Sequence, residues 1–186
     1  MSAIALPEVT TTTWNIDPVH SAAQFKVKHM MISNVKGEFT SVKGFLEFDE
    51  QNIENSRVQA EIDASTINTR EPQRDAHLKS ADFFDVEKFP TLSFRSTNVS
   101  RKSDGELAVT GALTIHGVTR PVTFAVEGPS ESTKDPWGNT RIGLSGTTKI
   151  NRKDFGLTWN AALETGGILV GEEVTITLDV QFVKAN

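Results

Sequence analysis

Apolar and polar residues alternate along most of this chain with a period of two. In residues 23–29, Ala23, Phe25 and Val27 alternate with glutamine and lysine, and in residues 174–182 every second position is valine, isoleucine, leucine or phenylalanine. A period of two places the apolar side chains on one face of a β-strand and the polar side chains on the other. We therefore expect half-buried strands with one face toward a common interior.

About eight to ten such stretches follow one another through short connections. Asp104-Gly105 is a strong two-residue hairpin turn, and we expect the returning strand to begin at Pro121, where a strand tolerates proline. This order fits an all-β antiparallel barrel or a sandwich. Closure removes exposed strand edges, so we favour a barrel, whose lumen has room for side chains or one small ligand.

One segment replaces the alternation with a helical pattern. Arg74, Leu78 and Ala81 recur at spacings of four and three residues, which is the spacing of one helix face. Pro72 suits the first turn, because its missing N–H would have no partner there. We predict one short helical insertion at about residues 71–84, two or three turns long, which acts as a lid over the lumen.

The aromatic residues are almost all of one type, with 11 Phe, 3 Trp and no Tyr. Phe83, Phe84 and Phe89 lie in or just after the predicted insertion, flanked by charged residues. We expect Phe83 and Phe84 to form either a packed hinge or a gate. An interior of phenyl rings without hydroxyls suits a hydrocarbon ligand, although plain core packing accounts for the same composition.

The length of 186 residues fits one domain, which we expect at residues 13–186 behind an N-terminal extension of residues 1–12. The net charge of −5 disfavours nonspecific binding to nucleic acid or to anionic membranes. No apolar run has the length of a membrane-spanning helix. The absence of cysteine excludes disulfides, thiolate catalysis and Cys-ligated metals.

The first twelve residues, MSAIALPEVTTT, lack the basic n-region and the apolar core of an export signal. We therefore expect a cytoplasmic protein. The periplasm is the alternative if a signal was removed.

Histidines are the first candidates for metal ligands. His29 shares the inward phase of Phe25 and Val27, so we expect a core histidine or a polar contact at one end of the lumen. His20 is expected to have a hydrogen-bonded ring in the turn at Asp17. We predict no metal site, because the four histidines lie on separate segments without a compact ligand spacing: His20, His29, His77 and His116.

A second group of polar candidates lies at or near the predicted helix. Arg70, Arg74 and His77 form a cationic set that would bind a phosphate or quinone headgroup through charge-assisted hydrogen bonds. The alternative is an internal salt bridge with neighbouring carboxylates. Those carboxylates are Asp75, Asp82 and Asp85. We predict no catalytic residue, since no nucleophile elbow, P-loop or dinucleotide fingerprint occurs.

Several motifs occur together in this chain. They are WNIDPVHS (14–21), FxVxH (25–29), VxGxF (35–39), RDAHLKSADFFD (74–85), FP (89–90) and LTIHGVTRPV (113–122). Together they closely resemble the YceI-like family, lipocalin-like bacterial polyisoprenoid-binding proteins, over about residues 13–183. The resemblance implies a lipocalin-like extended antiparallel β-barrel that holds a polyprenyl phosphate or quinone-type lipid. It also implies no catalysis, no cofactor besides that lipid, homodimers for some members and a periplasmic location for many.

We therefore predict non-catalytic binding, storage or transport of a long-chain isoprenoid lipid. An enzyme acting on an isoprenoid or other lipid, and a ligand-free structural or stress-response barrel with a filled interior, are the alternatives. The side chains expected to line the lumen are Phe25, Val27, Phe39, Leu46, Phe48, Ile62, Phe84, Phe94, Leu113, Phe124, Leu144, Trp159, Ile176 and Leu178.

Overall fold

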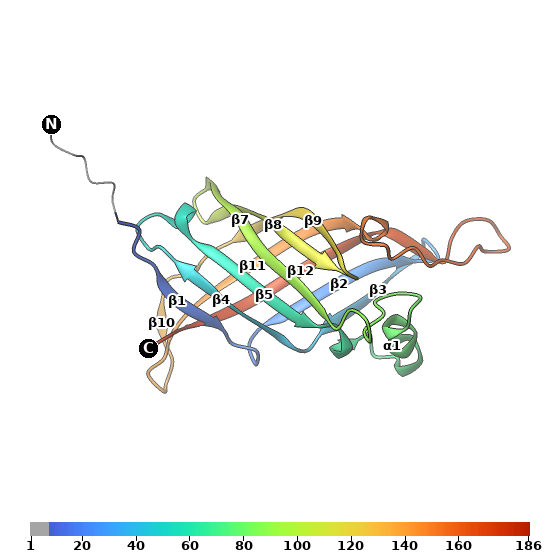
Figure 1. Ribbon diagram of the computed structural model, residues 1–186, viewed down its shortest axis with the longest axis horizontal. Helices are drawn as coiled ribbons and strands as arrows, with labels where there is room; N and C mark the ends of the chain where they lie inside the picture. The colour runs from blue at the N-terminus through green and yellow to red at the C-terminus, as the bar shows by residue number, and fades with distance from the viewer. Residues whose placement is uncertain (1–7) are drawn as a thin grey trace.

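The alternating stretches form the strands of one elongated β-barrel, shown in Figure 1. The computed structural model of the protein describes residues 8–186. Residues 1–7 of the predicted N-terminal extension lie outside this range, and the first strand begins within the extension, at Thr12. The strands are β1 (Thr12–Ile16), β2 (Ala22–His29), β3 (Ser33–Phe39), β4 (Val42–Phe48), β5 (Arg57–Asp63), β6 (Ile67–Asn68), β7 (Thr91–Ser103), β8 (Glu106–Ile115), β9 (Val118–Glu127), β10 (Thr133–Lys134), β11 (Thr140–Asn151) and β12 (Val170–Lys184).

The barrel closes through the two long C-terminal strands. One edge of β12 pairs with β11, and its other edge pairs with β1 and β2 in succession. Next to these, β4 pairs with β1 and β3 pairs with β2, and the pairing continues through β5 and β6. Short strands thus share single positions in the ring, and the result is a closed eight-stranded antiparallel barrel. The predicted fold class is confirmed.

The predicted start of β9 was wrong. β9 begins at Val118, and His116 and Gly117 form the turn from β8 with φ angles of 54° and 71°. Pro121 therefore lies inside the strand. It is tolerated there because β11 pairs with β9 only at residues 125–127, so the β9 edge beside Pro121 needs no hydrogen-bond donor.

The helical insertion contains α1 (Pro72–Lys79), with Pro72 at its start as predicted. The Glu71 carboxylate caps α1 by accepting hydrogen bonds from the backbone N–H groups of Gln73 at 3.1 Å and Arg74 at 2.6 Å. Among residues 8–186 the other helical turns are the short 3₁₀ helices η1 (Ile53–Asn55), η2 (Ala64–Thr66) and η3 (Arg152–Phe155). None of the helices in this part of the chain is long and apolar enough to cross a membrane.

The α-helix ends earlier than the predicted limit at residue 84. The hydroxyl of Ser80 donates to the carbonyl of His77 at 2.6 Å, and the Ser80 N–H donates to the same carbonyl at 3.1 Å. This tightens the last turn, so the chain continues as turns from residue 81 to residue 84. The predicted place of Ala81 on the helix face was therefore wrong, because Ala81 follows the helix and is exposed.

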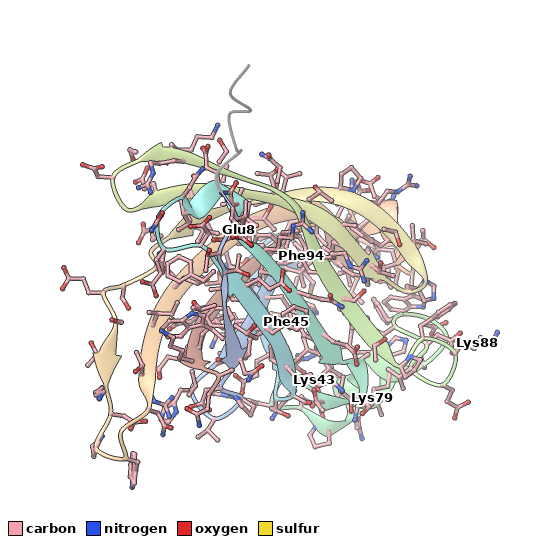
Figure 2. All side chains as sticks on the ribbon, turned by 60° about the vertical axis from the view of Figure 1, so that its left-hand side comes forward. Glu8, Lys43, Phe45, Lys79, Lys88 and Phe94 are labelled. Atoms are coloured by element: carbon pink, nitrogen blue, oxygen red, sulfur yellow. The ribbon has the colours of Figure 1, made fainter. Side chains whose placement is uncertain are left out.

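The end of the barrel near the C-terminus has a packed apolar interior. Trp14 and Phe182 are each 1% exposed, and Ile142 packs in the same cluster. At the opposite end, Figure 1 shows α1 and the segment of residues 156–169. Figure 2 shows Lys43, Lys79 and Lys88 projecting from the outer surface.

An ion cluster joins the segments around the packed end. Arg141 bridges Asp17 and Asp135, with 2.7 Å between Arg141 Nε and Asp135 Oδ2. His20 Nδ1 lies 2.8 Å from Asp17 Oδ2, as expected for a hydrogen-bonded turn histidine. The hydrogen bond from Arg141 holds the pKa of Asp17 far below its usual range and lowers the pKa of Asp135 to about 2.

Candidate functional site: the barrel cavity

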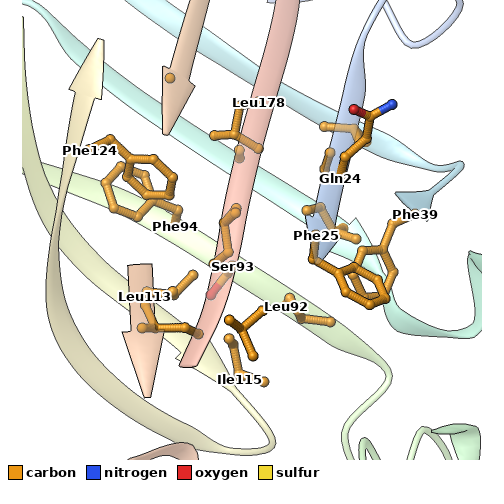
Figure 3. A pocket seen from close by; sticks show the side chains of 18 of the residues that line it. Gln24, Phe25, Phe39, Leu92, Ser93, Phe94, Leu113, Ile115, Phe124 and Leu178 are labelled. Atoms are coloured by element: carbon orange, nitrogen blue, oxygen red, sulfur yellow. The ribbon is translucent and has the colours of Figure 1, made fainter. Parts of the chain in front are cut away.

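The barrel encloses a cavity of about 370 Å³ with an almost entirely apolar wall. This volume lies in the range of small-molecule pockets, roughly 300 to 1,000 Å³. Two pairs of rings border the space, as Figure 3 shows: Phe25 with Phe39, and Phe94 with Phe124. The ring centroids are 5.8 Å apart in the first pair and 5.2 Å apart in the second. A structural barrel without a ligand would have a filled interior, whereas the interior of this barrel is not filled.

All fourteen side chains expected in the lumen border this cavity. They come from the strands around the ring and from two segments outside the strands, which contribute Phe84 and Trp159. Some of them, such as Leu46 and Phe124, are also buried parts of the packed core, whereas Phe25 and Val27 are half-buried. The structure brings the set together, and the contact of each member with a ligand stays a prediction.

Two glycines hold phenyl rings against the wall. Phe25 pairs with Gly37 across β2 and β3, and a Cβ atom on Gly37 would lie 2.5 Å from Phe25 Cζ. A Cβ atom on Gly111 would likewise lie 2.5 Å from Phe94 Cζ. The missing side chains therefore make room for the rings, which would otherwise be pushed into the cavity.

An aromatic cluster borders the cavity at the α1 end. The ring of Trp159 lies 4.7 Å from the ring of His77 and 5.3 Å from that of Phe83, measured between centroids. Phe83 is 7% exposed and packs against His77 and Trp159. Phe84 is half-buried and meets Phe39 edge-on at 5.7 Å, so of the two rings predicted as hinge or gate it is the better candidate for the gate.

Arg74 reaches the same end of the cavity and is positioned by Thr69. Its Nε donates to Thr69 Oγ1 and its Nη2 donates to the Thr69 carbonyl, both at 2.8 Å. The Thr69 hydroxyl in turn donates to Asp75. Among residues 8–186, no carboxylate lies within ion-pair distance of Arg74 and its Nη1 has no hydrogen-bond acceptor. The guanidinium keeps a charged donor for another group.

The other predicted cationic residues are placed differently. His77 Nε2 lies 2.8 Å from Asp82 Oδ2, so the internal-pair alternative holds for this side chain. Arg70 lies outside the cavity, in a surface depression beside Thr40 and Pro72. His29 borders the cavity and is half-buried. The structure therefore groups Arg74, His77 and His29 along one cavity and separates Arg70 from them.

Arg152 borders the cavity, and no sequence pattern indicated this position. It is 3% exposed, and its guanidinium donates to the carbonyls of Gly171, Leu157, Trp159 and Val170. Burial lowers the pKa of this group, and the nearby Glu172 carboxylate raises it. A buried arginine usually pairs with a carboxylate, and no sequence motif marks one that binds four carbonyls. Arg152 ties residues 157–159 to the start of β12.

Few polar groups border the cavity, and three of them are positioned by hydrogen bonds within the protein. No group of three or more His, Asp or Glu side chains in residues 8–186 has a metal-binding arrangement. Arg74, His77 and Arg152 make positioning hydrogen bonds. This arrangement suits binding of an apolar molecule with one anionic or polar end.

The comparison with protein families decides the relationship of this chain. A family model described as the YceI-like domain matches residues 14–182. The chain belongs to the YceI-like family. A UPF0312 protein of Vibrio vulnificus is 41% identical to this YceI-like protein over 138 residues, covering 74% of this chain and 72% of the relative. A UPF0312 protein of Staphylococcus aureus is 37% identical over 171 residues, covering 92% and 97%.

Solved structures agree with the fold of this YceI-like protein. A YceI protein of Campylobacter jejuni is 28% identical with a TM-score of 0.72, covering 86% of this chain and 90% of that one. BcnA of Burkholderia cenocepacia is 22% identical with a TM-score of 0.76, covering 89% and 98%. A polyisoprenoid binding domain from Saccharophagus degradans is 15% identical with a TM-score of 0.67, covering 95% and 100%. The last two comparisons concern the fold alone.

Proposed function

We propose that this YceI-like protein binds and carries a long-chain isoprenoid lipid in the barrel cavity without chemically changing it. The observation that carries the proposal is the unfilled apolar cavity of about 370 Å³ bordered by phenyl rings. A related fold is named as a polyisoprenoid binding domain, which supports the same ligand class.

The energetics favour a flexible hydrocarbon. Burial of a methylene group contributes about 0.8 kcal/mol, so about ten methylenes contribute about 8 kcal/mol before the costs of binding. This corresponds to micromolar affinity at most, and a longer chain adds to it. The apolar wall therefore supplies most of the affinity, and a polar end group has a secondary, orienting role.

The end group is proposed to be anionic or strongly polar and to lie near Arg74. A polyprenyl phosphate and a quinone-type lipid both present oxygen acceptors to the free Nη1 donor of Arg74. The proposed role is non-catalytic binding, with Arg74 and His77 held in position by hydrogen bonds with Thr69 and Asp82. Chemical conversion of an isoprenoid lipid after it is added to the purified protein would contradict this role.

Mass spectrometry of an organic extract tests the ligand class. The protein is purified without detergent, extracted and compared with an extract of unrelated protein from the same cells. We expect an isoprenoid in the first extract alone. An extract without lipid, or one that contains only phospholipid and fatty acid, would contradict the proposal.

A pair of arginine variants tests the headgroup site. Arg74→Ala is expected to weaken binding of a prenyl phosphate about 10- to 150-fold, because a charge-assisted hydrogen bond contributes roughly 1.5 to 3 kcal/mol. Binding of the matching prenyl alcohol should change less. Arg70→Ala is the control, since Arg70 lies near the same helix but outside the cavity. Equal losses for phosphate and alcohol would argue against headgroup recognition by Arg74.

A further inference from the structure

The hairpin of β2 and β3 ends in an apolar tip that the cavity does not use. Met30, Met31 and Ile32 are 40%, 58% and 78% exposed. They follow directly on Val27 and His29, which border the cavity, and the Met30 N–H donates to the Leu169 carbonyl at 2.7 Å. Figure 1 shows this tip at the α1 end of the barrel. An apolar surface therefore adjoins the end of the cavity that carries the loops.

The backbone of the tip is poorly suited to the side chains it carries. Met30 and Met31 have φ angles of 51° and 59°, and the Ile32 N–H donates to the His29 carbonyl at 3.1 Å. Residues 30–32 form the loop, and Met30 and Met31 are the two central residues of a turn in which positive φ favours Asn-Gly, because bulkier side chains disfavour this conformation. Two methionines here cost stability and expose apolar surface, so folding alone does not account for them.

Unpaired positive charge lies behind the tip. Residues 26–36 contain Lys26, Lys28 and Lys36 and no acidic residue. Lys26 and Lys36 are directly opposite each other across the two strands, an arrangement that destabilises a sheet. No carboxylate in residues 8–186 lies within ion-pair distance of these three lysines, whereas Lys149 pairs with Glu173 and Lys153 pairs with Glu172.

We propose that the tip of residues 30–32 inserts into the surface of an anionic lipid bilayer while Lys26, Lys28 and Lys36 contact its headgroups. Apolar side chains combined with basic ones bind such surfaces, and each lysine near an anionic surface contributes to the attraction. The charge is local and coexists with the net charge of −5, which disfavours attachment through other faces. Where the proposed function also holds, docking places the α1 end of the cavity against the lipid source.

A lysine on an edge strand also discourages pairing with other strands. That role fits Lys36, because β6 pairs with β3 only at Glu38 and Phe39. It does not account for exposed methionine and isoleucine, which favour association. A second copy of this chain is the competing occupant of the tip, and the experiment distinguishes it from a bilayer.

Vesicle flotation of the full-length protein tests the proposal. The protein is mixed with vesicles of phosphatidylcholine alone or of phosphatidylcholine with phosphatidylglycerol. We expect flotation with the anionic vesicles, suppressed by salt. The triple variant Met30→Asn, Met31→Gly, Ile32→Ser should lose at least tenfold in binding and stay folded, because Asn-Gly suits the turn. Replacing Lys26 and Lys36 by Gln should weaken binding about fivefold per lysine.

Trp137→Ser is the matched control, because Trp137 is 82% exposed and lies in the turn between β10 and β11. Its binding should equal that of the unaltered protein. The proposal is overturned if the unaltered protein does not float with anionic vesicles, if the triple variant floats equally well, or if Trp137→Ser loses as much. It is also overturned if light scattering without vesicles shows that the unaltered protein is a dimer and the triple variant is a monomer, while vesicle binding does not change.

Lipid extraction from the same preparations separates this proposal from the proposed function. An isoprenoid in the extract together with failed flotation would overturn the docking surface alone. Flotation of a protein that yields no isoprenoid would overturn the proposed function and support the docking surface.

Discussion

Trp14 and Phe182 are each 1% exposed at the packed end of the barrel, whereas Phe84 and Trp159 remain half-buried at the α1 end. Strand pairing and close packing hold the first end. Side chain to backbone hydrogen bonds, from Arg74 and Arg152, hold the segments at the second end. Regions with few buried contacts open at lower free energy than packed ones. We therefore expect the packed end to contribute most to the stability of the barrel and a ligand to enter the cavity at the α1 end.

Truncation at the packed end should have the largest effect on stability. Trp14→Ala is expected to lower the free energy of unfolding by about 3 to 5 kcal/mol, because Trp14 is 1% exposed and its removal leaves a void at a position that does not border the barrel cavity. Phe84→Ala at the other end should lower it by less and should speed lipid release. Urea unfolding and release of a fluorescent prenyl ligand measure the two effects. Equal stability losses with unchanged release would abolish the contrast between the ends.

Loss of Arg152 should loosen the α1 end without affecting the packed end. Arg152→Met leaves buried carbonyls of Leu157 and Gly171 without a donor, so we expect a loss of about 2 to 4 kcal/mol. Hydrogen exchange should rise in residues 156–170 and stay unchanged in β1. Arg120→Met is the control, since Arg120 donates to one exposed carbonyl, that of Asp154. Uniformly faster exchange across the barrel would contradict a local role.

Gly37→Ala should reduce the cavity at a smaller cost in stability. The new Cβ would displace the ring of Phe25 toward the cavity, and we expect a loss of about 1 to 3 kcal/mol together with weaker lipid binding. Gly143→Ala is the control, because the nearest heavy atom to its Cβ would be 3.7 Å away. Ligand titration and thermal unfolding measure both. If Gly37→Ala binds the lipid normally, the ring does not border the occupied space.

Acid should weaken the ion cluster around the packed end, with the smallest effect. In the folded protein, the pKa values of Asp17 and Asp135 lie below the ordinary value of 3.8, mainly because of the hydrogen bonds from Arg141. Their stabilisation is therefore present above the unfolded value and is lost as the pH falls from about 4 through the folded values, about 2 for Asp135. Arg141→Gln should reduce this slope in urea unfolding between pH 5 and pH 2, roughly the window these shifts define. An unchanged slope would show that the ion cluster does not cause the loss of stability in acid.

The fold class and the inward set followed from local patterns. Alternation in residues 174–182 assigned faces correctly in β12, because strand side chains point to opposite sides by geometry. Pro72 correctly indicated the start of α1 for a similar local reason. The helix end was not predictable in this way, since the Ser80 bonds to His77 close the last turn whereas Ala81 fits the helical spacing equally well.

Placement of the polar residues depended on contacts that sequence spacing does not contain. Arg70 and Arg74 are four residues apart and looked equivalent, yet only Arg74 borders the cavity. Arg152 binds carbonyls in segments up to 19 residues away, and every residue has a carbonyl, so no residue type identifies the acceptors.

By itself, the sequence determined that strands would alternate, that they would present phenyl rings inward and that a short helix would interrupt them, because these properties depend on neighbouring residues. The tertiary structure alone decided that the ring of strands would leave about 370 Å³ unfilled, and which charges would border that space. Both outcomes depend on how side chains from distant strands meet across the interior, and the sizes of individual residues do not specify that fit.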